Sequence, residues 1–390
     1  MKTMLIVSDV AFSPANEGNR KRISDLIEAY EKLGIDVTVI LIEGTGNIEE
    51  MRKRLGGRLL VCHRSPIERL RILFGRILRF GMGLIGMHRW RNYPLDSWGC
   101  KAAQSAVRSL GEGKAFDFVQ CQYLYLSACL EVANDNSIKI IDTNDLMSDR
   151  WRMFPPDEVP NVWYSLSKRD ELVGCRRADV VLAISRTDQR HFNDLGVIGV
   201  ELCDFIAPPR SLWSPTSRRV IFLGSDNRMN RSGLRWLVEE VLPLVLREAP
   251  DFRLSVAGRV AAHFSKHEGI EIVGEFTSLD ELFADCRFML NPVSLGTGLA
   301  IKNLDALSRG IPIICTTNAA RGIEEFCGRG VAIASNAIDF ANLVVDQWRN
   351  VDVLNKQSEL LGLAYGTAYA ASMRRLATIF ARADEESAQR

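Results

Sequence analysis

The sequence predicts an α/β protein built from two doubly wound domains of similar size. The chain has 390 residues, more than one hydrophobic core usually organises. Short apolar runs of strand length alternate with helical stretches, a pattern typical of parallel sheets covered on both faces. This alternation breaks once, at 205–217, and then starts again.

The first series opens with a strand, a helix and a second strand. Thr3 to Ser8 reads TMLIVS and is followed by a polar loop, an amphipathic helix at 20–33, Gly34 and a strand at 36–42. Further strands of this series are expected at 58–62, 116–121, 138–141 and 180–184.

The second series follows a Pro/Ser-rich segment, FIAPPRSLWSPTS, which is interpreted as the interdomain linker. Its strands are expected at 220–223, 254–257, 271–273, 288–290, 311–315 and 331–334. The expected division is an N-terminal domain at 1–207, a C-terminal domain at 208–365 and a terminal helix at 366–390.

Composition and charge argue against several classes of protein. The net charge is +1, so the chain as a whole has no attraction to nucleic acid. The nine cysteines are scattered without a C-x-x-C pair, which argues against a structural zinc site. Residues 1–10 lack the marks of a signal peptide, so a cytoplasmic location is expected. Arginines interrupt the apolar stretches before the roughly 18–20 residues that a membrane span needs.

The strongest local signal is the segment SLGTGLAIKNLDALSRGIP at 294–312, where a strand leads into a glycine-flanked loop and a helix beginning near Leu299. Gly296 and Gly298 permit close backbone approach to an anion, and the free N–H groups of the helix start face it. Lys302 adds a mobile positive charge. This pattern predicts a phosphate-binding site beyond the carboxyl ends of the strands.

Residues 219–312 resemble the C-terminal domain of the glycosyltransferase group 1 and family 4 enzymes. The matching pieces, in order, are FLGS, an Asn that opens a helix, SVAGR, VGEF, GTGLAIKNLDAL and IPII. The resemblance implies the GT-B architecture, in which two Rossmann-like domains flank a cleft. It also implies a UDP- or GDP-linked sugar as donor, an acceptor site in the N-terminal half, transfer with retention, and no metal or other cofactor.

The resemblance assigns roles to residues of the C-terminal half. Many family members have two Glu residues separated by seven others, and Thr297 and Asp305 stand at these positions. Asp305 keeps a carboxylate for the ribose hydroxyls, whereas Thr297 leaves the donor sugar undetermined. Lys302 and Arg259 are expected to neutralise the leaving diphosphate, and Glu275 and Phe276 to form the base pocket. The other expected donor-binding residues are Gly224, Ser225, Asn230, Gly298 and Leu299.

The alternative roles are structural: a solvated helix residue for Asp305, a surface lysine for Lys302, and a rim residue for Arg259.

Two segments of the N-terminal half are candidates for the acceptor side. Residues 8–22 resemble the family's glycine loop, with Gly18 at one of its glycine positions; an ordinary strand-to-helix connection is the alternative. Asp145 follows a strand end, where its carboxylate is expected to contact or activate an acceptor hydroxyl, or to cap the next helix.

The stretch 64–91 interleaves arginines with Leu, Ile, Phe and Met, and Glu68 is its only acidic residue. This composition is typical of an interfacial membrane helix, which would bring a lipid-linked acceptor within reach at the inner leaflet. The alternative is an amphipathic helix packed on the N-terminal domain with a solvated basic rim.

The sequence thus predicts a glycosyltransferase of surface polysaccharide or glycoconjugate biosynthesis. Two alternatives remain open. One is a nucleotide-sugar epimerase of the same architecture, which would need acid and base groups that the five scattered histidines do not supply. The other is a nucleotide-sugar-binding module without turnover, which Thr297 and the reduced glycine loop keep open.

Overall fold

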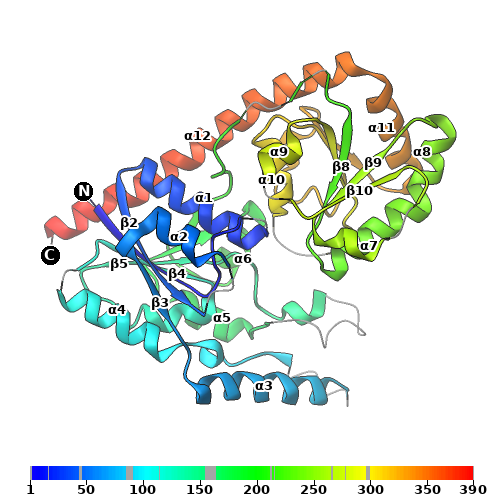
Figure 1. Ribbon diagram of the computed structural model, residues 1–390. Coiled ribbons are helices and arrows are strands. Elements are labelled where there is room, and N and C mark those ends of the chain that lie inside the picture. The colour runs from blue at the N-terminus through cyan, green and yellow to red at the C-terminus, as the bar shows by residue number, and fades with distance from the viewer. Residues whose placement is uncertain are drawn as a thin grey trace. The chain divides into compact units, whose positions relative to one another are not determined.

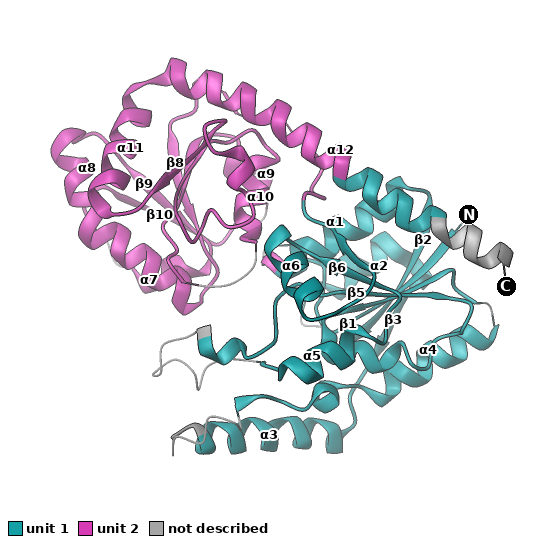
Figure 2. Cartoon of the chain, turned by 180° about the vertical axis from the view of Figure 1, so that it is seen from behind, with its two compact units in different colours: residues 1–15, 19–204, 372–390 teal, residues 16–18, 205–371 magenta. Residues whose placement is uncertain are grey.

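The computed structural model describes residues 2–15, 17–43, 46–84, 91–113, 115–153, 164–210, 213–214, 216–264, 267–276, 278–295 and 299–389. The chain divides into two compact units, shown in Figure 2. Unit 1 comprises residues 1–15, 19–204 and 372–390, and unit 2 comprises residues 16–18 and 205–371.

Unit 1 contains a parallel sheet in the order β3-β2-β1-β4-β5-β6-β7. Its strands are β1 (Lys2–Ser8), β2 (Ile35–Ile42), β3 (Leu59–Cys62), β4 (Phe118–Gln122), β5 (Ile138–Asp142), β6 (Val180–Ala183) and β7 (Val200–Leu202). Its helices, seen in Figure 1, are α1 (Gly18–Lys32), α2 (Ile48–Leu55), α3 (Pro66–Leu84), α4 (Lys101–Gly113), α5 (Lys168–Cys175) and α6 (Arg186–Asp194).

Unit 2 repeats this plan with a parallel sheet in the order β10-β9-β8-β11-β12-β13. Its strands are β8 (Arg219–Leu223), β9 (Leu254–Ala257), β10 (Ile270–Gly274), β11 (Cys286–Asn291), β12 (Ile313–Thr316) and β13 (Val331–Ala334). Its helices are α7 (Arg228–Trp236), α8 (Leu242–Glu248), α9 (Leu279–Phe283), α10 (Ile301–Leu307), α11 (Ala337–Arg349) and the first part of α12 (Val351–Gln389).

These sheets confirm the predicted fold class. Continuous apolar runs become central strands because both faces of a parallel sheet are covered by helices. Met4, Leu5, Ile6 and Val7 of β1 are all completely buried. In both sheets the strand order reverses beside the first strand of the unit, the place where doubly wound sheets bind ligands at the carboxyl edge.

Helix α12 belongs to unit 2 up to residue 371 and to unit 1 from Ser372 onward. In unit 2, the Tyr365 hydroxyl donates a hydrogen bond to the carbonyl of Ala207 at 2.8 Å. In unit 1, Ser372 and Arg375 both bind the buried carboxylate of Asp204. One continuous helix therefore supplies packing surface to both cores.

A buried ion pair joins α1 to the end of β5 in unit 1. Arg22 Nη2 lies 2.5 Å from Asp142 Oδ1, and Arg22 Nε lies 3.0 Å from Asp142 Oδ2. The Arg22 and Asp142 side chains are 2% and 0% exposed. Water cannot solvate a buried cation that has lost its partner. The ion pair therefore fixes α1 against the carboxyl edge of the sheet.

We expect Asp142→Asn to lower the free energy of unfolding of unit 1 by about 3–5 kcal/mol, because it leaves the Arg22 charge buried without a carboxylate. Urea denaturation followed by fluorescence and circular dichroism measures this loss. Asp135→Asn is the control, since the Asp135 carboxylate is fully exposed and solvent screens its ion pair with Lys139. Equal stability of the two variants would contradict the assignment.

Candidate functional site

Lys302 lies in a polar cluster at the carboxyl edge of the unit 2 sheet. Its ammonium donates a hydrogen bond to Asn230 Oδ1 at 2.7 Å and lies 4.9 Å from the centre of the Phe222 ring. Asn230 Nδ2 in turn donates to the carbonyl of Ser225 at 3.0 Å. The structure thus brings together Ser225 just after β8, Asn230 on α7 and Lys302 on α10, three residues that the sequence proposed separately.

The first turn of α7 holds Asn230 in this position. Asn227 is the N-cap residue, and its side-chain oxygen accepts the backbone N–H of Asn230 at 2.9 Å. This capping bond satisfies one of the open donors at the helix start. It also fixes the helix so that the Asn230 side chain, which is 6% exposed, meets Lys302.

The environment of Lys302 favours loss of its proton. The side chain is half-buried, and it makes no ion pair among the residues that the structure describes. Burial lowers the pKa of Lys302 from 10.5 to about 7. A buried cation without a carboxylate partner is typical of a functional site that receives an anion.

Two glycines bring β8 and β9 close together beside this cluster. Gly258 has a φ of +87°, and a Cβ at that position would lie 2.3 Å from the Gly224 carbonyl oxygen. A Cβ on Gly224 would lie 3.0 Å from a methyl group of Val260. Neither position accepts a side chain without movement of the backbone or its neighbours. Arg259 follows directly and is exposed.

The other predicted donor residues are not all part of the Lys302 cluster. Gly298 and Thr297, together with Gly296, lie outside the described residues, so their roles stay predictions. Leu299 is buried just before α10. Glu275 is exposed and Phe276 is half-buried, both directly after β10. The side chains of Lys302 and Asn230, two of the predicted donor residues, are in direct contact.

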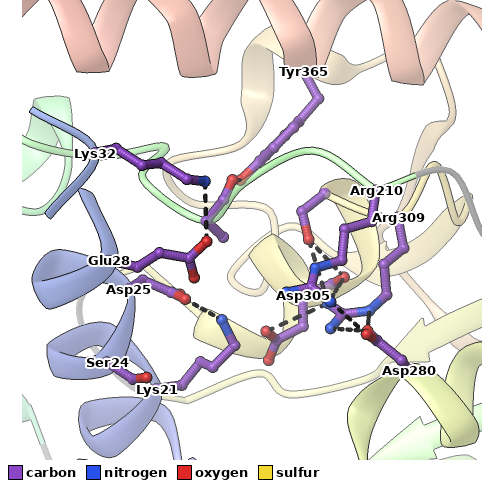
Figure 3. Close-up of polar contacts among 12 residues, drawn as sticks. Lys21, Ser24, Asp25, Glu28, Lys32, Arg210, Asp280, Asp305, Arg309 and Tyr365 are labelled. Atoms are coloured by element: carbon purple, nitrogen blue, oxygen red, sulfur yellow. Dashed lines mark hydrogen bonds and ion pairs between the residues drawn. The ribbon is translucent and has the colours of Figure 1, made fainter. Parts of the chain in front are cut away.

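Asp305 is buried on α10, one turn after Lys302, and faces an arginine. Its Oδ1 lies 3.8 Å from Arg309 Nη1. Figure 3 shows these two side chains together with Asp280. The Arg309 guanidinium also donates to Asp280 Oδ1 at 2.6 and 2.9 Å. This arrangement gives Asp305 a structural contact in addition to the ribose contact that the sequence predicts.

Asn303 and Asn291 are a pair that sequence reasoning missed. Asn291 Nδ2 donates to Asn303 Oδ1 at 2.9 Å, and Asn303 Nδ2 donates to the Ala319 carbonyl at 2.7 Å. Both side chains are completely buried, so these bonds tie α10 to the end of β11. The available signal was a polar residue, Asn291, at the end of a strand that is apolar over Phe288 to Leu290.

The carboxyl edge of the unit 1 sheet holds the acceptor-side candidates. Asp145 is half-buried after β5, its Oδ2 lies 3.3 Å from Arg150 Nη1, and burial raises the pKa of its carboxyl group. Gly18, the first residue of α1, is grouped with unit 2. Tyr123 and Asn144 adopt φ values of +66° and +57° directly beyond β4 and β5. Such backbone strain in non-glycine residues clusters at functional sites.

A second polar group on this edge was not predicted. Asp9 accepts the hydroxyl of Tyr125 at 2.9 Å and a guanidinium N–H of Arg64 at 3.2 Å, and burial raises its pKa. Tyr123 forms a hydrogen bond with the Asn19 side chain and lies close enough to Asp9 and Asp145 for both charges to raise its pKa beyond the effect of burial. The signal available in the sequence was the carboxylate directly after the first strand.

No group of three or more His, Cys, Asp or Glu side chains within the described ranges has the geometry of a metal site.

The two doubly wound units give the chain the GT-B fold. Its residues 217–350 match the family model described as "Glycosyl transferases group 1", which spans most of unit 2. Unit 2 is therefore similar to this family over residues 217–350.

Solved structures similar to the chain have the same fold. Anabaena HepE, determined in complex with UDP, is 11% identical, with a TM-score of 0.64 over 98% of this chain and 100% of that one. TarM from S. aureus, determined with UDP, fondaparinux and alpha-GlcNAc-glycerol, is 10% identical, with a TM-score of 0.66 over 97% and 100%. Sucrose-phosphate synthase from Thermosynechococcus elongatus is 11% identical, with a TM-score of 0.65 over 98% and 99%.

A Klebsiella pneumoniae protein described as "Uncharacterized 44.6 kDa protein in cps region" is 24% identical over 90% of this chain and 92% of its own length. The similarity thus covers both units.

The lowered pKa of Lys302 predicts a specific dependence of stability on pH. Between about pH 7 and 10.5 the unfolded chain binds this proton and the folded chain does not, so the contribution of Lys302 to stability rises with pH. The difference in unfolding free energy between the wild type and Lys302→Met should therefore increase with pH, by at most about 1.4 kcal/mol per pH unit. Urea titrations at a series of pH values measure it.

The control Lys356→Met, on the exposed side of α12, should give a pH-independent difference. The same flat profile for Lys302→Met would show that Lys302 stays protonated.

Proposed function

We propose that the chain transfers a sugar from a UDP- or GDP-linked donor to a saccharide or lipid-linked acceptor, with retention of configuration and without a metal ion. Unit 2 binds the donor, and unit 1 binds the acceptor. The observation that carries this proposal is the half-buried ammonium of Lys302, held by Asn230 at the carboxyl edge of a domain similar to the glycosyltransferase group 1 family.

The donor side carries cations that can stabilise the leaving diphosphate, which is the main chemical requirement of sugar transfer. As the bond from the sugar to the diphosphate breaks, negative charge grows on the departing phosphate oxygens. A cation preoriented in a poorly solvated place stabilises this charge more strongly than water does. Lys302 is such a group, because Asn230 directs its ammonium and the Phe222 ring lies beside it. Arg259, which follows the close approach of β8 and β9, supplies a second cation.

The acceptor side needs a group that accepts a proton from the attacking hydroxyl. Asp145 suits this role because burial raises its pKa and thereby strengthens it as a base. Arg150 holds the carboxylate at 3.3 Å. Tyr123 lies in the same neighbourhood, where it is buried and its ring stacks on that of Tyr125 at 5.3 Å.

The relatives support the donor class and the pathway. HepE and TarM were determined with UDP bound, which supports a uridine nucleotide. The Klebsiella relative is described as lying in a cps region, which supports a role in surface polysaccharide biosynthesis.

A nucleotide-sugar-binding module without turnover is the second candidate, because Thr297 replaces a carboxylate of the family pattern. A panel of UDP-, GDP- and dTDP-sugars separates the two functions. Release of nucleoside diphosphate in the presence of an acceptor supports the transferase, whereas saturable binding without product across the panel supports the module.

We expect Lys302→Met to lower kcat/KM for transfer by about 10²- to 10³-fold, because the leaving diphosphate loses its positioned cation. Steady-state release of nucleoside diphosphate from the preferred donor measures the effect. Lys356→Met is the matched control and should keep wild-type activity. A wild-type rate in Lys302→Met would remove this residue from the donor site.

We expect Asp145→Asn to lower transfer to the acceptor by about 10²-fold and to leave nucleotide affinity unchanged, because the amide keeps the shape of the side chain but accepts no proton. Transfer rates and nucleotide titrations on the same preparation measure the two effects. The control is Asp135→Asn, an exposed carboxylate of the same unit. A parallel loss of nucleotide affinity would contradict an acceptor-side role.

A further inference from the structure

Helix α3 exposes an unusual amount of apolar surface. Fifteen large hydrophobic side chains of the described residues are exposed, and seven of them lie on this one helix. Their exposed fractions run from 40% at Leu78 to 79% at Ile67. Figures 1 and 2 both show α3 at the periphery of unit 1. Contiguous exposed apolar surface of this kind marks an interaction site.

The exposed apolar side chains form one continuous arc. At about 100° per residue along an α-helix, they span roughly 160° of the helix circumference, and no charged residue falls inside that arc. The members of this apolar arc are Ile67, Leu70, Leu73, Phe74, Ile77, Leu78 and Phe80.

The opposite side of α3 is attached to unit 1. Glu68 accepts backbone N–H groups from Ser65 and Lys101 at 2.8 and 2.9 Å. The Arg79 guanidinium donates to the Asn92 carbonyl at 3.1 Å and lies 4.1 Å from the centre of the Tyr93 ring. These contacts orient the helix so that the apolar arc faces away from the unit.

Arginines border the apolar arc on both sides. Arg71 lies beyond one margin, and Arg69 and Arg76 lie beyond the other. All three side chains are exposed. Arg71 and Arg76 make no ion pair within the described part of the chain, and the one acidic residue of the helix, Glu68, points to the attached side.

We propose that α3 docks unit 1 on an anionic lipid surface, with the apolar arc inserted at the boundary between headgroups and acyl chains and the arginines on the headgroup phosphates. No described helix is long and apolar enough to cross a membrane, so α3 lies in the plane of the surface. The arrangement fits this occupant because a phosphate layer complements both arginine margins at once.

The charge pattern disfavours a second copy of the chain as the occupant. Two α3 helices packed through their apolar arcs would bring arginine margins together, with no exposed acidic residue on either helix to offset them. A bilayer surface imposes no such repulsion. The proposal does not depend on the sugar-transfer activity, since docking is measured without donor or acceptor.

Co-sedimentation of the full chain with vesicles tests the proposal. The wild type should bind equimolar phosphatidylglycerol and phosphatidylcholine vesicles at low salt, and should bind phosphatidylcholine vesicles much more weakly. Arg71→Gln with Arg76→Gln should weaken partition about 25-fold, because each arginine near an anionic surface contributes roughly fivefold. Leu70→Ser with Ile77→Ser should abolish sedimentation with either vesicle.

Matched controls separate docking from folding and from general surface chemistry. Ile198→Ser removes an apolar side chain of unit 1 that is 90% exposed, and Arg108→Gln removes an exposed arginine on α4. Both should bind as the wild type does, and all variants should keep its circular dichroism spectrum and melting temperature. Failure of the folded wild type to bind anionic vesicles overturns the proposal, as does equal binding to both vesicle types. Concentration-dependent dimers that Leu70→Ser with Ile77→Ser dissociates would assign the arc to a second copy and also overturn it.

Discussion

The hydrogen bond between Lys302 and Asn230 is the interaction on which the unit 2 site depends. An ammonium removed from water without a carboxylate partner destabilises the fold, so its surroundings must hold it firmly. The Asn227 cap fixes α7, and the bond between Asn291 and Asn303 fixes α10. These hydrogen bonds fix the positions of α7 and α10. A purely apolar interface would allow the two helices to slide. A bound anion would offset the free energy that is lost when the Lys302 ammonium is desolvated.

The carboxyl edges of the two sheets are built alike but carry groups of opposite charge. In each, parallel strands end at one edge of the sheet, and the connections beyond that edge carry the polar side chains. The edge of unit 2 presents a cation with a lowered pKa, whereas that of unit 1 presents carboxyl groups, Asp9 and Asp145, with raised pKa values. The first suits an anionic leaving group and the second suits proton acceptance from a hydroxyl. Both properties suit the sugar transfer that we propose.

Most strands were predicted from sequence because a buried parallel strand is a continuous apolar run, as 254–257 and 331–334 show. Strand β7 was missed since its three residues carry too little pattern. Lys302 was found from the glycine loop before it, but its partner lies 72 residues away, and spacing does not reveal such a bond. The role of Tyr123 was hidden for a related reason: its backbone strain arises from the fold and has no local sequence signal.

Helix α3 shows why local charge matters more than the net charge of +1. Both the Lys302 cluster and the margins of the apolar arc present cations suited to phosphate groups, yet the two differ in hydration. The guanidiniums of Arg71 and Arg76 are exposed to solvent. Lys302 is desolvated and titrates near pH 7. A rise in pH through this range would therefore remove positive charge from Lys302 and weaken the attraction that we propose between Lys302 and a diphosphate.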